Sequence, residues 1–186
     1  MIEVHLVRHG ATTAPKGVMI GSLDYPLSRE GRHQALNLAA GLEGLKFNMV
    51  LTSPLARARE TAELIWGPVE PRAVVVEQFR EISLGLWEGL TGAEARAANP
   101  DVWDRRGLNM AGVAPPGGES YEDLAGRVLP AFDLAMRELD SGSCVLLVAH
   151  QAVNRVILCR AQNLPLDSCW KIEQKHCSVI KVDYYN

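Results

Sequence analysis

Five short apolar runs, rich in β-branched residues and bounded by Gly, Pro, Ser or charge, constrain the fold of this chain most strongly. Runs of this length and composition predict β-strands. The first and fourth runs are nearly continuous in apolar character, which is typical of strands covered on both faces. The predicted strands are Ile2–Val7, Met49–Thr52, Ala73–Val76, Cys144–Ala149 and Val179–Val182.

Two helical patterns follow the first and second strands. Ser28 is predicted to cap a helix that runs to about Leu42. Ser53 followed by Pro54 predicts a second helix start, an N-cap with proline in the first helical position. The residues expected to face the core are Ala35, Leu38, Ala39 and Leu42 in the first helix and Leu55, Ala58, Ala62 and Ile65 in the second.

Two further helices are predicted on either side of the fourth strand. Ser120 with Asp123 three residues later indicates a capping box, and Pro130 is expected to kink the helix that follows. The other helix begins directly after His150. Strands that alternate with helices predict an α/β fold, here a three-layer α/β/α arrangement with a mostly parallel central sheet. The segment from about 87 to 118, rich in Gly, Pro, Ala and Arg, is predicted to be a lid or insertion over the site.

The length of 186 residues predicts one domain over 1–186 with a sizeable core. A net charge of −3 excludes the broad basic surface typical of nucleic-acid binding, so no nucleic-acid partner is expected. No apolar stretch reaches the length of a membrane span and the first residues do not resemble a signal peptide. We therefore expect a cytoplasmic protein with no membrane partner, as a monomer or a homodimer.

The four cysteines are scattered and form no C-x-x-C pair. Packed free thiols are therefore expected rather than disulfides. The pair His176-Cys177 could suggest a metal site, but no second pair stands at ligand spacing. We expect no metal and no cofactor. The cysteines are Cys144, Cys159, Cys169 and Cys177.

The first strand runs directly into Arg8-His9-Gly10. Ligands bind at the carboxyl ends of strands in open α/β sheets, and an imidazole can act there as base, nucleophile or metal ligand. Glycine allows the backbone to approach a ligand closely. Taken alone, the tripeptide fits an ordinary strand end with a solvated arginine and a packed histidine equally well.

Three more segments place polar side chains at strand ends. The second strand leads into a helix that carries Arg57, the fourth strand ends on His150, and the loop after the third strand carries Glu81 and Glu88. Adjacent parallel first and fourth strands would bring the two histidines together. Two imidazoles, two guanidiniums and the free N–H groups of a helix start suit a phosphate dianion, with one acid for the leaving oxygen. The predicted cluster is Arg8, His9, Arg57 and His150, with Glu81 or Glu88 as the acid.

These segments together resemble the histidine phosphatase superfamily, also called the phosphoglycerate mutase-like family. The resemblance covers nearly the whole chain. It is carried by Arg8-His9-Gly10, by 21–31 with Gln34-Ala35, by 53–62, by Glu81 with 85–89, by 116–120 and by 148–150.

The resemblance implies that His9 attacks phosphorus and becomes a phosphohistidine, which water then hydrolyses. Arg8, Arg57 and His150 would hold the phosphoryl oxygens, and Glu81 would protonate the leaving oxygen and then activate water. Glu88 is the second candidate for that acid. The positions implied to contact substrate or phosphate besides these are Gly10, Thr12, Gly21, Ser22, Arg105, Arg106 and Gln151.

The chain departs from the family pattern in the loop after His9. Ala11 and Pro15 stand where the family usually has an acidic or amide residue and an asparagine, and neither side chain can form a hydrogen bond to phosphate. Thr12 or Thr13 could supply a hydroxyl instead. Gln151 follows the second histidine where many members have glycine.

Three classes of function remain open. The compact segment between Glu81 and His150 and the run 170–180 resemble small-molecule phosphatases, in particular α-ribazole phosphatases of cobalamin biosynthesis. Arg105-Arg106 resembles the segment with which mutases grip phosphoglycerate, although solvated lid charges fit equally well. A protein phosphohistidine phosphatase or a non-catalytic binding protein on this fold are further alternatives.

Overall fold

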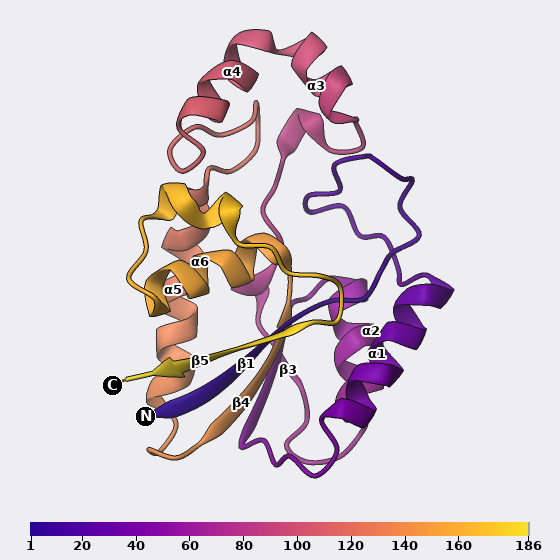
Figure 1. Ribbon diagram of the computed structural model, residues 1–186, viewed down its shortest axis with the longest axis vertical. Helices are drawn as coiled ribbons and strands as arrows, with labels where there is room; N and C mark the ends of the chain where they lie inside the picture. The colour runs from indigo at the N-terminus through magenta and orange to yellow at the C-terminus, as the bar shows by residue number, and fades with distance from the viewer. Residues whose placement is uncertain (186) are drawn as a thin grey trace.

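The computed structural model describes residues 1–185 and contains a five-stranded sheet in the order β3-β2-β4-β1-β5 (Figure 1). Four strands are parallel, and β5 pairs antiparallel with β1 at one edge. The predicted mostly parallel sheet is confirmed, although the third strand is only two residues long. The strands are β1 (Ile2–Arg8), β2 (Met49–Thr52), β3 (Val74–Val75), β4 (Cys144–Ala149) and β5 (Val179–Tyr184).

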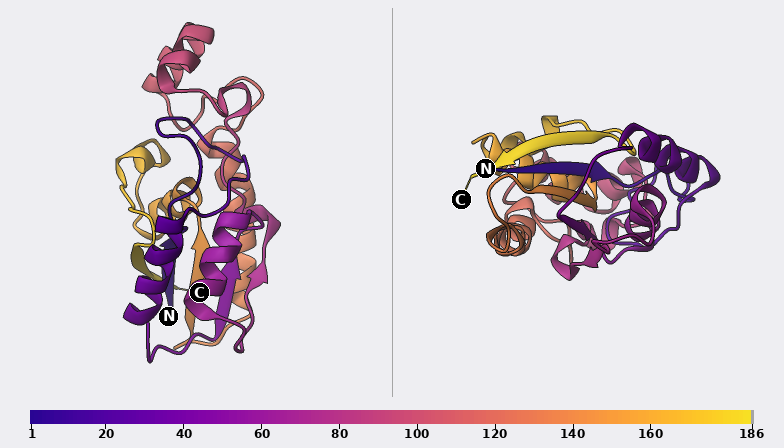
Figure 2. Two further views of the ribbon diagram at one scale, coloured as in Figure 1. Left: turned by 90° about the vertical axis from the view of Figure 1, so that its right-hand side faces the viewer. Right: turned by 90° about the horizontal axis from the view of Figure 1, so that it is seen from below.

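Helices cover both faces of this sheet (Figures 1 and 2). On one face, α1 (Arg29–Gly41) and α2 (Ala56–Trp66) pack with Val7, Leu146 and Val148. On the other, α5 (Tyr121–Arg137) and α6 (Gln151–Ala161) form the larger core cluster. Successive strand residues point to opposite faces, so β1 and β4 need apolar side chains at most positions. This arrangement confirms the predicted three layers.

Helix starts follow their predicted capping signals in two of three cases. The Ser28 hydroxyl accepts the Gly31 N–H at the start of α1. Ser120 and Asp123 form the reciprocal bonds of a capping box before α5, which continues as one helix through Pro130.

The predicted N-cap at Ser53 is wrong. α2 begins at Ala56, with Leu55 as its N-cap. The Ser53 N–H still donates to the Val148 carbonyl (3.2 Å), so the chain is strand-like at this point. Its hydroxyl lies 2.6 Å from His150 Nε2 and also accepts the Leu55 N–H. The Ser53 side chain therefore binds His150, a residue distant in the sequence, instead of capping the helix as the local pattern predicted.

The segment 87–118 extends beyond the carboxyl ends of the strands (Figure 1). It contains two short helices, α3 (Gly92–Ala98) and α4 (Pro100–Leu108), which the Gly- and Pro-rich composition did not predict. Thr91 and Glu94 form a capping box before α3, and Pro100 occupies the first turn of α4. Three short 3₁₀ helices complete the elements of residues 1–185: η1 (Glu77–Phe79), η2 (Gly85–Trp87) and η3 (Leu166–Lys171).

The four cysteines are free, as predicted, but only two of them are buried. Cys159 and Cys169 lie in the core, whereas Cys144 and Cys177 are partly exposed. Among the helices of residues 1–185, none combines the length and the apolar character needed to cross a membrane.

Candidate active site

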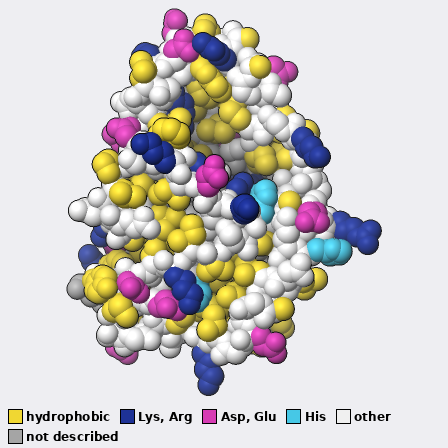
Figure 3. All heavy atoms as spheres, viewed as in Figure 1, with side chains coloured by type: hydrophobic (Ala, Val, Ile, Leu, Met, Phe, Trp, Pro, Cys, Tyr) yellow, Lys and Arg dark blue, Asp and Glu magenta, His cyan; other side chains and the backbone are white. Residues whose placement is uncertain are grey.

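The parallel pairing of β1 with β4 determines the centre of the site. Arg8 pairs in register with Ala149, and the His9 N–H donates to the Ala149 carbonyl (3.0 Å). Arg8 is followed by His9 and Ala149 by His150, and the ring centroids of these two histidines lie 5.1 Å apart. Both imidazoles are buried, with 5% and 0% exposure. Figure 3 shows histidine and Arg or Lys side chains together in a hollow of this face.

His9 has one ring nitrogen occupied and the other free. Nδ1 lies 2.7 Å from the Gly10 carbonyl oxygen, to which it donates its proton. A neutral imidazole carries only one N–H, so Nε2 then keeps its lone pair. Burial lowers the pKa of His9 well below its usual range, and the charges of Arg57 and Arg8 lower it further. The ring is therefore neutral at pH 7 and can act as a nucleophile through Nε2.

Gly10 is required sterically at the position after His9. A Cβ there would lie 2.5 Å from the carbonyl oxygen of Gly31. The Gly10 N–H donates to the Thr61 hydroxyl of α2 (3.1 Å), which fixes the backbone to which His9 is bonded.

His150 has the opposite pattern of partners. Nε2 lies 2.6 Å from the Ser53 hydroxyl, whereas Nδ1 is buried and has no hydrogen-bond partner in residues 1–185. Burial lowers the pKa of His150 well below its usual range, and His9 and Arg57 add to this effect. His150 is also the N-cap of α6, whose first N–H groups point toward the strand ends.

Two guanidinium groups flank the histidines. Arg57, only 1% exposed, donates to the carbonyls of Leu23 (2.5 Å) and Gly21 (2.9 Å), and Arg8 donates to the carbonyl of Gln174 (2.7 Å). Burial lowers the pKa of both groups. Within the described chain neither forms an ion pair with a carboxylate, and each has a buried Nε without a partner. An unpaired buried cation such as Arg57 is costly, and the partly exposed Arg8 adds a second positive charge, so this pocket favours a bound anion.

Glu81 is the acid beside this pocket. Its Oε1 accepts the Ile82 N–H (3.0 Å), and its Oε2 accepts the Ala152 N–H of α6 (3.3 Å). Burial raises the pKa of Glu81 above its usual value, against the opposing effect of these hydrogen bonds and of Arg57. A raised pKa suits a general acid.

Glu88, the second candidate, has a structural role. Its Oε1 accepts from the Ser22 N–H (2.7 Å), the Ser22 hydroxyl (2.8 Å) and the Leu84 N–H (3.0 Å). The carboxylate thereby ties the 21–24 loop to the loop that carries Glu81. These bonds favour Glu81 over Glu88 as the proton donor.

The remaining predicted contact residues divide into two groups. Gln151 and Arg106 line a cavity of about 200 Å³ together with Glu81, Tyr121 and Trp170. Arg105 lies exposed on α4. Helical neighbours point in different directions, so the lid directs only one of this arginine pair into the cavity.

Gly21 lines the same cavity, with φ of 53° and its carbonyl bonded to Arg57. The Ser22 hydroxyl is bonded to Glu88. Thr12 bridges to Leu27, and its hydroxyl accepts the Ala14 N–H (3.4 Å), so none of the contacts found in residues 1–185 joins it to the histidines.

Sequence reasoning missed the role of the turn before β5. His176 stands there with its ring 5.5 Å from that of His9, and burial, with Arg8, lowers its pKa to about 4. Gln174 is buried and holds this turn by donating to the Leu6 carbonyl (2.9 Å) and accepting from Asn154 (2.8 Å). The signal in the sequence is the pair His176-Cys177, which the pattern alone relates only to a metal site.

Comparison with known proteins places this geometry in a family. A model of the histidine phosphatase superfamily (branch 1) matches residues 4–186. The chain belongs to this superfamily. Curated relatives include probable phosphoglycerate mutase GpmB of Shigella boydii and of Escherichia coli, each 30% identical over 99% of this chain and 86% of the relative.

Solved structures of other members of the superfamily share the fold. The α-ribazole phosphatase of Shigella flexneri superimposes with a TM-score of 0.89 at 26% identity, over 98% of this chain and 91% of that one. A mycobacterial glucosyl-3-phosphoglycerate phosphatase gives 0.84 at 29% identity, over 96% and 88%. The protein YhfR of Bacillus stearothermophilus gives 0.86 at 32% identity, over 98% and 91%. Named relatives thus include both phosphatases and probable mutases.

Proposed function

We propose that this member of the superfamily hydrolyses a small-molecule phosphomonoester through a phosphohistidine intermediate. One observation carries the proposal: the free Nε2 of neutral His9 lies in a pocket with two guanidiniums, the buried one of Arg57 and the partly exposed one of Arg8, and neither has a carboxylate partner in residues 1–185. Such a pocket holds a phosphate dianion against a nucleophile.

In the first step, His9 Nε2 bonds to phosphorus as the bond from phosphorus to the ester oxygen breaks. The leaving oxygen takes the proton of Glu81, so an alcohol departs rather than an alkoxide. Arg8, Arg57 and Nδ1 of His150 stabilise the charge on the phosphoryl oxygens during the transfer. These guanidiniums supply the positive charge that metal ions provide in many other phosphoryl-transfer sites.

In the second step, the Glu81 carboxylate takes a proton from water while the water oxygen attacks the phosphohistidine. The bond from phosphorus to nitrogen breaks, inorganic phosphate forms, and His9 and protonated Glu81 are restored. Glu81 therefore acts as acid and then as base. Its raised pKa supports the first role, and its hydrogen bonds to two N–H groups support the second.

For the substrate, we propose α-ribazole 5′-phosphate. The likeness to the α-ribazole phosphatase structure supports this choice, as does the compact segment between Glu81 and His150. The test is phosphate release from a panel of phosphomonoesters that includes α-ribazole 5′-phosphate. The expected result is the highest kcat/KM for that ester, and release from no member of the panel would refute the hydrolase.

A phosphoglycerate mutase is the second candidate. The relatives named probable phosphoglycerate mutase favour it, and Arg106 lines the cavity beside Glu81. The exposed position of Arg105 removes half of the cationic pair on which the resemblance rested. Interconversion of 2- and 3-phosphoglycerate without phosphate release would establish the mutase instead.

We further propose that residues 1–186 act as one domain, with 87–118 as a lid over the leaving group. Residue 186 lies outside the described part of the chain. Trp87, Trp103 and Met110 of this segment line a cavity of about 290 Å³, and this cavity shares Leu84, Arg106 and Met110 with the cavity at Glu81. Substitution of Trp103 by alanine should raise KM for bulky esters more than for small ones.

A further inference from the structure

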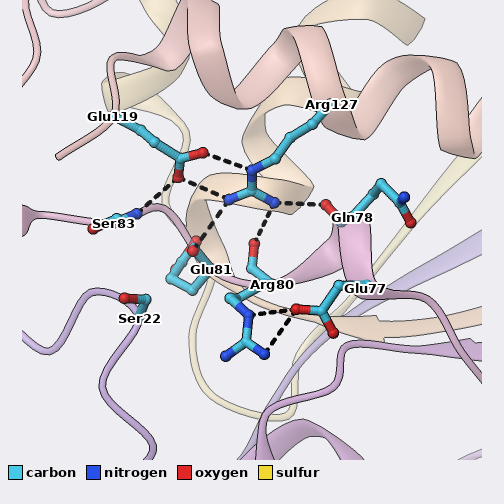
Figure 4. A pocket seen from close by; sticks show the side chains of 8 residues that line it. All are labelled: Ser22, Glu77, Gln78, Arg80, Glu81, Ser83, Glu119 and Arg127. Atoms are coloured by element: carbon cyan, nitrogen blue, oxygen red, sulfur yellow. Dashed lines mark hydrogen bonds and ion pairs between the residues drawn. The ribbon is translucent and has the colours of Figure 1, made fainter.

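The proposed acid is carried by a loop that has little regular structure of its own. Residues 80–84 lie between η1 and η2 and belong to no helix or strand. The loop borders a cavity of about 550 Å³, drawn in Figure 4. A general acid must be held within a few tenths of an ångström of its productive position. Something outside the loop must therefore fix its backbone.

Arg127 of α5 reaches this loop with its guanidinium group (Figure 4). Nη1 donates to the carbonyls of Gln78 (2.6 Å) and Arg80 (2.9 Å), and Nη2 donates to the carbonyl of Glu81 itself (3.2 Å). The other two donors, on Nε and Nη2, bind the carboxylate of Glu119 (2.7 and 2.9 Å). Guanidinium has five N–H donors, and all five are used here.

Glu119 completes the attachment on the other side of the acid. Its Oε2 also accepts the Ser83 N–H (2.9 Å). Arg127 and Glu119 thus bind the chain before, at and after Glu81, through the Gln78 carbonyl in η1 and through two carbonyls and one N–H in the loop. The side chains of Arg127 and Glu119 are each about one-quarter exposed and lie at the edge of the cavity. Their opposite charges balance each other there.

We infer that Arg127, together with Glu119, is the positioning element that aims Glu81 at the leaving oxygen. In residues 1–185 Arg127 forms no hydrogen bond with the histidines, although its charge contributes to the lowered pKa of His150. Its direct contacts are with the segment that carries the acid, so we assign its role to the acid and not to the phosphate. The inference rests on the proposed function. It adds that a side chain outside the cationic pocket controls delivery of the proton.

Leaving-group chemistry separates this role from a merely structural one. The strongly basic alkoxide of an alkyl phosphate must be protonated as it leaves, whereas the weakly basic p-nitrophenolate leaves without a proton. The value of kcat/KM reports only the steps up to loss of the alcohol, because those steps end in the phosphoenzyme. A displaced Glu81 should therefore lower kcat/KM for an alkyl phosphate and leave the value for p-nitrophenyl phosphate nearly unchanged.

The experiment compares Arg127→Met with Glu81→Gln on propyl phosphate and on p-nitrophenyl phosphate. Arg127→Met should lower kcat/KM for propyl phosphate about 100-fold, as a misplacement of about 1 Å does, and by less than about threefold for p-nitrophenyl phosphate. A burst of p-nitrophenol should appear because hydrolysis of the phosphohistidine also needs Glu81. Adding Arg127→Met to Glu81→Gln should change little, because the two act as a unit.

Arg80→Met is the matched control. Arg80 belongs to the same loop and borders the same cavity, but the one side-chain partner found for it in residues 1–185 is the exposed Glu77. The control should hydrolyse both esters like the parent protein. Arg127→Lys should recover part of the loss, because an ammonium can reach one or two carbonyls but cannot bind both partners.

Equal losses on both esters, or independent losses in the double variant, would overturn the inference. Should Arg127→Met fail to fold, Glu119→Gln provides the same comparison with the guanidinium in place. Failure of the proposed function gives a different result: the parent protein would hydrolyse neither ester, or Glu81→Gln would itself lack the dependence on the leaving group.

Discussion

The ends of β1 and β4 are similar in sequence and position but differ in their hydrogen bonds. Each strand is parallel to the other and delivers a buried histidine whose pKa is lowered by burial. At the end of β1, the Gly10 carbonyl takes the proton of His9 Nδ1 and leaves Nε2 free. At the end of β4, Ser53 occupies Nε2 of His150 and leaves Nδ1 without a partner. Strand pairing brings the two rings together, and the local partner of each ring assigns its role.

The largest effect is expected from removal of the free Nε2 of His9 at the end of β1. His9→Ala should lower kcat/KM by at least about 10⁴-fold, because the proposed nucleophile is lost. Trapping with a radiolabelled phosphate ester should yield no phosphoprotein. Phosphohistidine found at position 150 in this variant would reverse the assignment. His33→Ala is the control, since His33 is exposed on α1.

Substitution of the histidine at the end of β4 should lower the activity less. His150→Ala removes one donor to the phosphoryl oxygens, and losing such a donor typically costs about 10²–10³-fold in kcat. A phosphohistidine at position 9 should still form, only more slowly. Rapid-quench trapping measures that rate. A loss as complete as that of His9→Ala would mean that the two ends do not have separate roles.

Lowering the pH should destabilise the folded protein through the histidines at the ends of both strands. His9, His150 and His176 have lowered pKa values in the folded protein, so unfolding takes up protons below pH 6.5. Stability should fall from pH 7.5 to 5.5, with up to about 1.4 kcal/mol per pH unit for each proton taken up. The raised pKa of Glu81 acts in the opposite direction. Urea unfolding measures this slope.

Single variants then show how much each strand end contributes to the change of the unfolding free energy with pH. His9→Gln and His150→Gln should each make stability less dependent on pH, whereas His33→Gln should leave the slope unchanged. A slope that is the same in all three variants would show that the buried histidines are not the groups that take up protons.

The smallest expected effect is that of the hydroxyl that distinguishes the two ends. Ser53→Ala leaves His150 Nε2 without its partner and should lower the free energy of unfolding by about 1 kcal/mol. We expect kcat/KM to fall about tenfold, because His150 then turns more freely. Steady-state assays and thermal unfolding measure both effects. An unchanged kcat/KM would show that Ser53 does not orient His150.

Several parts of the site could be predicted from local pattern. The apolar runs and their polar ends predicted that Arg8, His9 and His150 would lie at one edge of the sheet, because parallel neighbouring strands end together. Ser28 and Ser120 were recognisable as helix caps because a cap depends on residues three positions apart. The choice of Glu81 as the proposed acid came from the resemblance to a family rather than from spacing.

Other parts could not be predicted because they depend on contacts between distant residues. Ser53 has the sequence signal of an N-cap, but its partner His150 is 97 residues away. His176 reaches His9 only because β5 returns antiparallel beside β1. The exposure of Arg105 and the burial of Arg106 depend on how α4 packs in the lid.

The sequence by itself determined which chemical groups stand at the strand ends, since periodicity and capping are properties of neighbouring residues. Only the tertiary structure decided which nitrogen of each imidazole is free and which cations lack a carboxylate. It also decided that Arg127 uses all five of its donors around Glu81. The physical reason is that burial and hydrogen-bond partners come from the packing of segments far apart in the chain, and these set the pKa and direction of every group in the site.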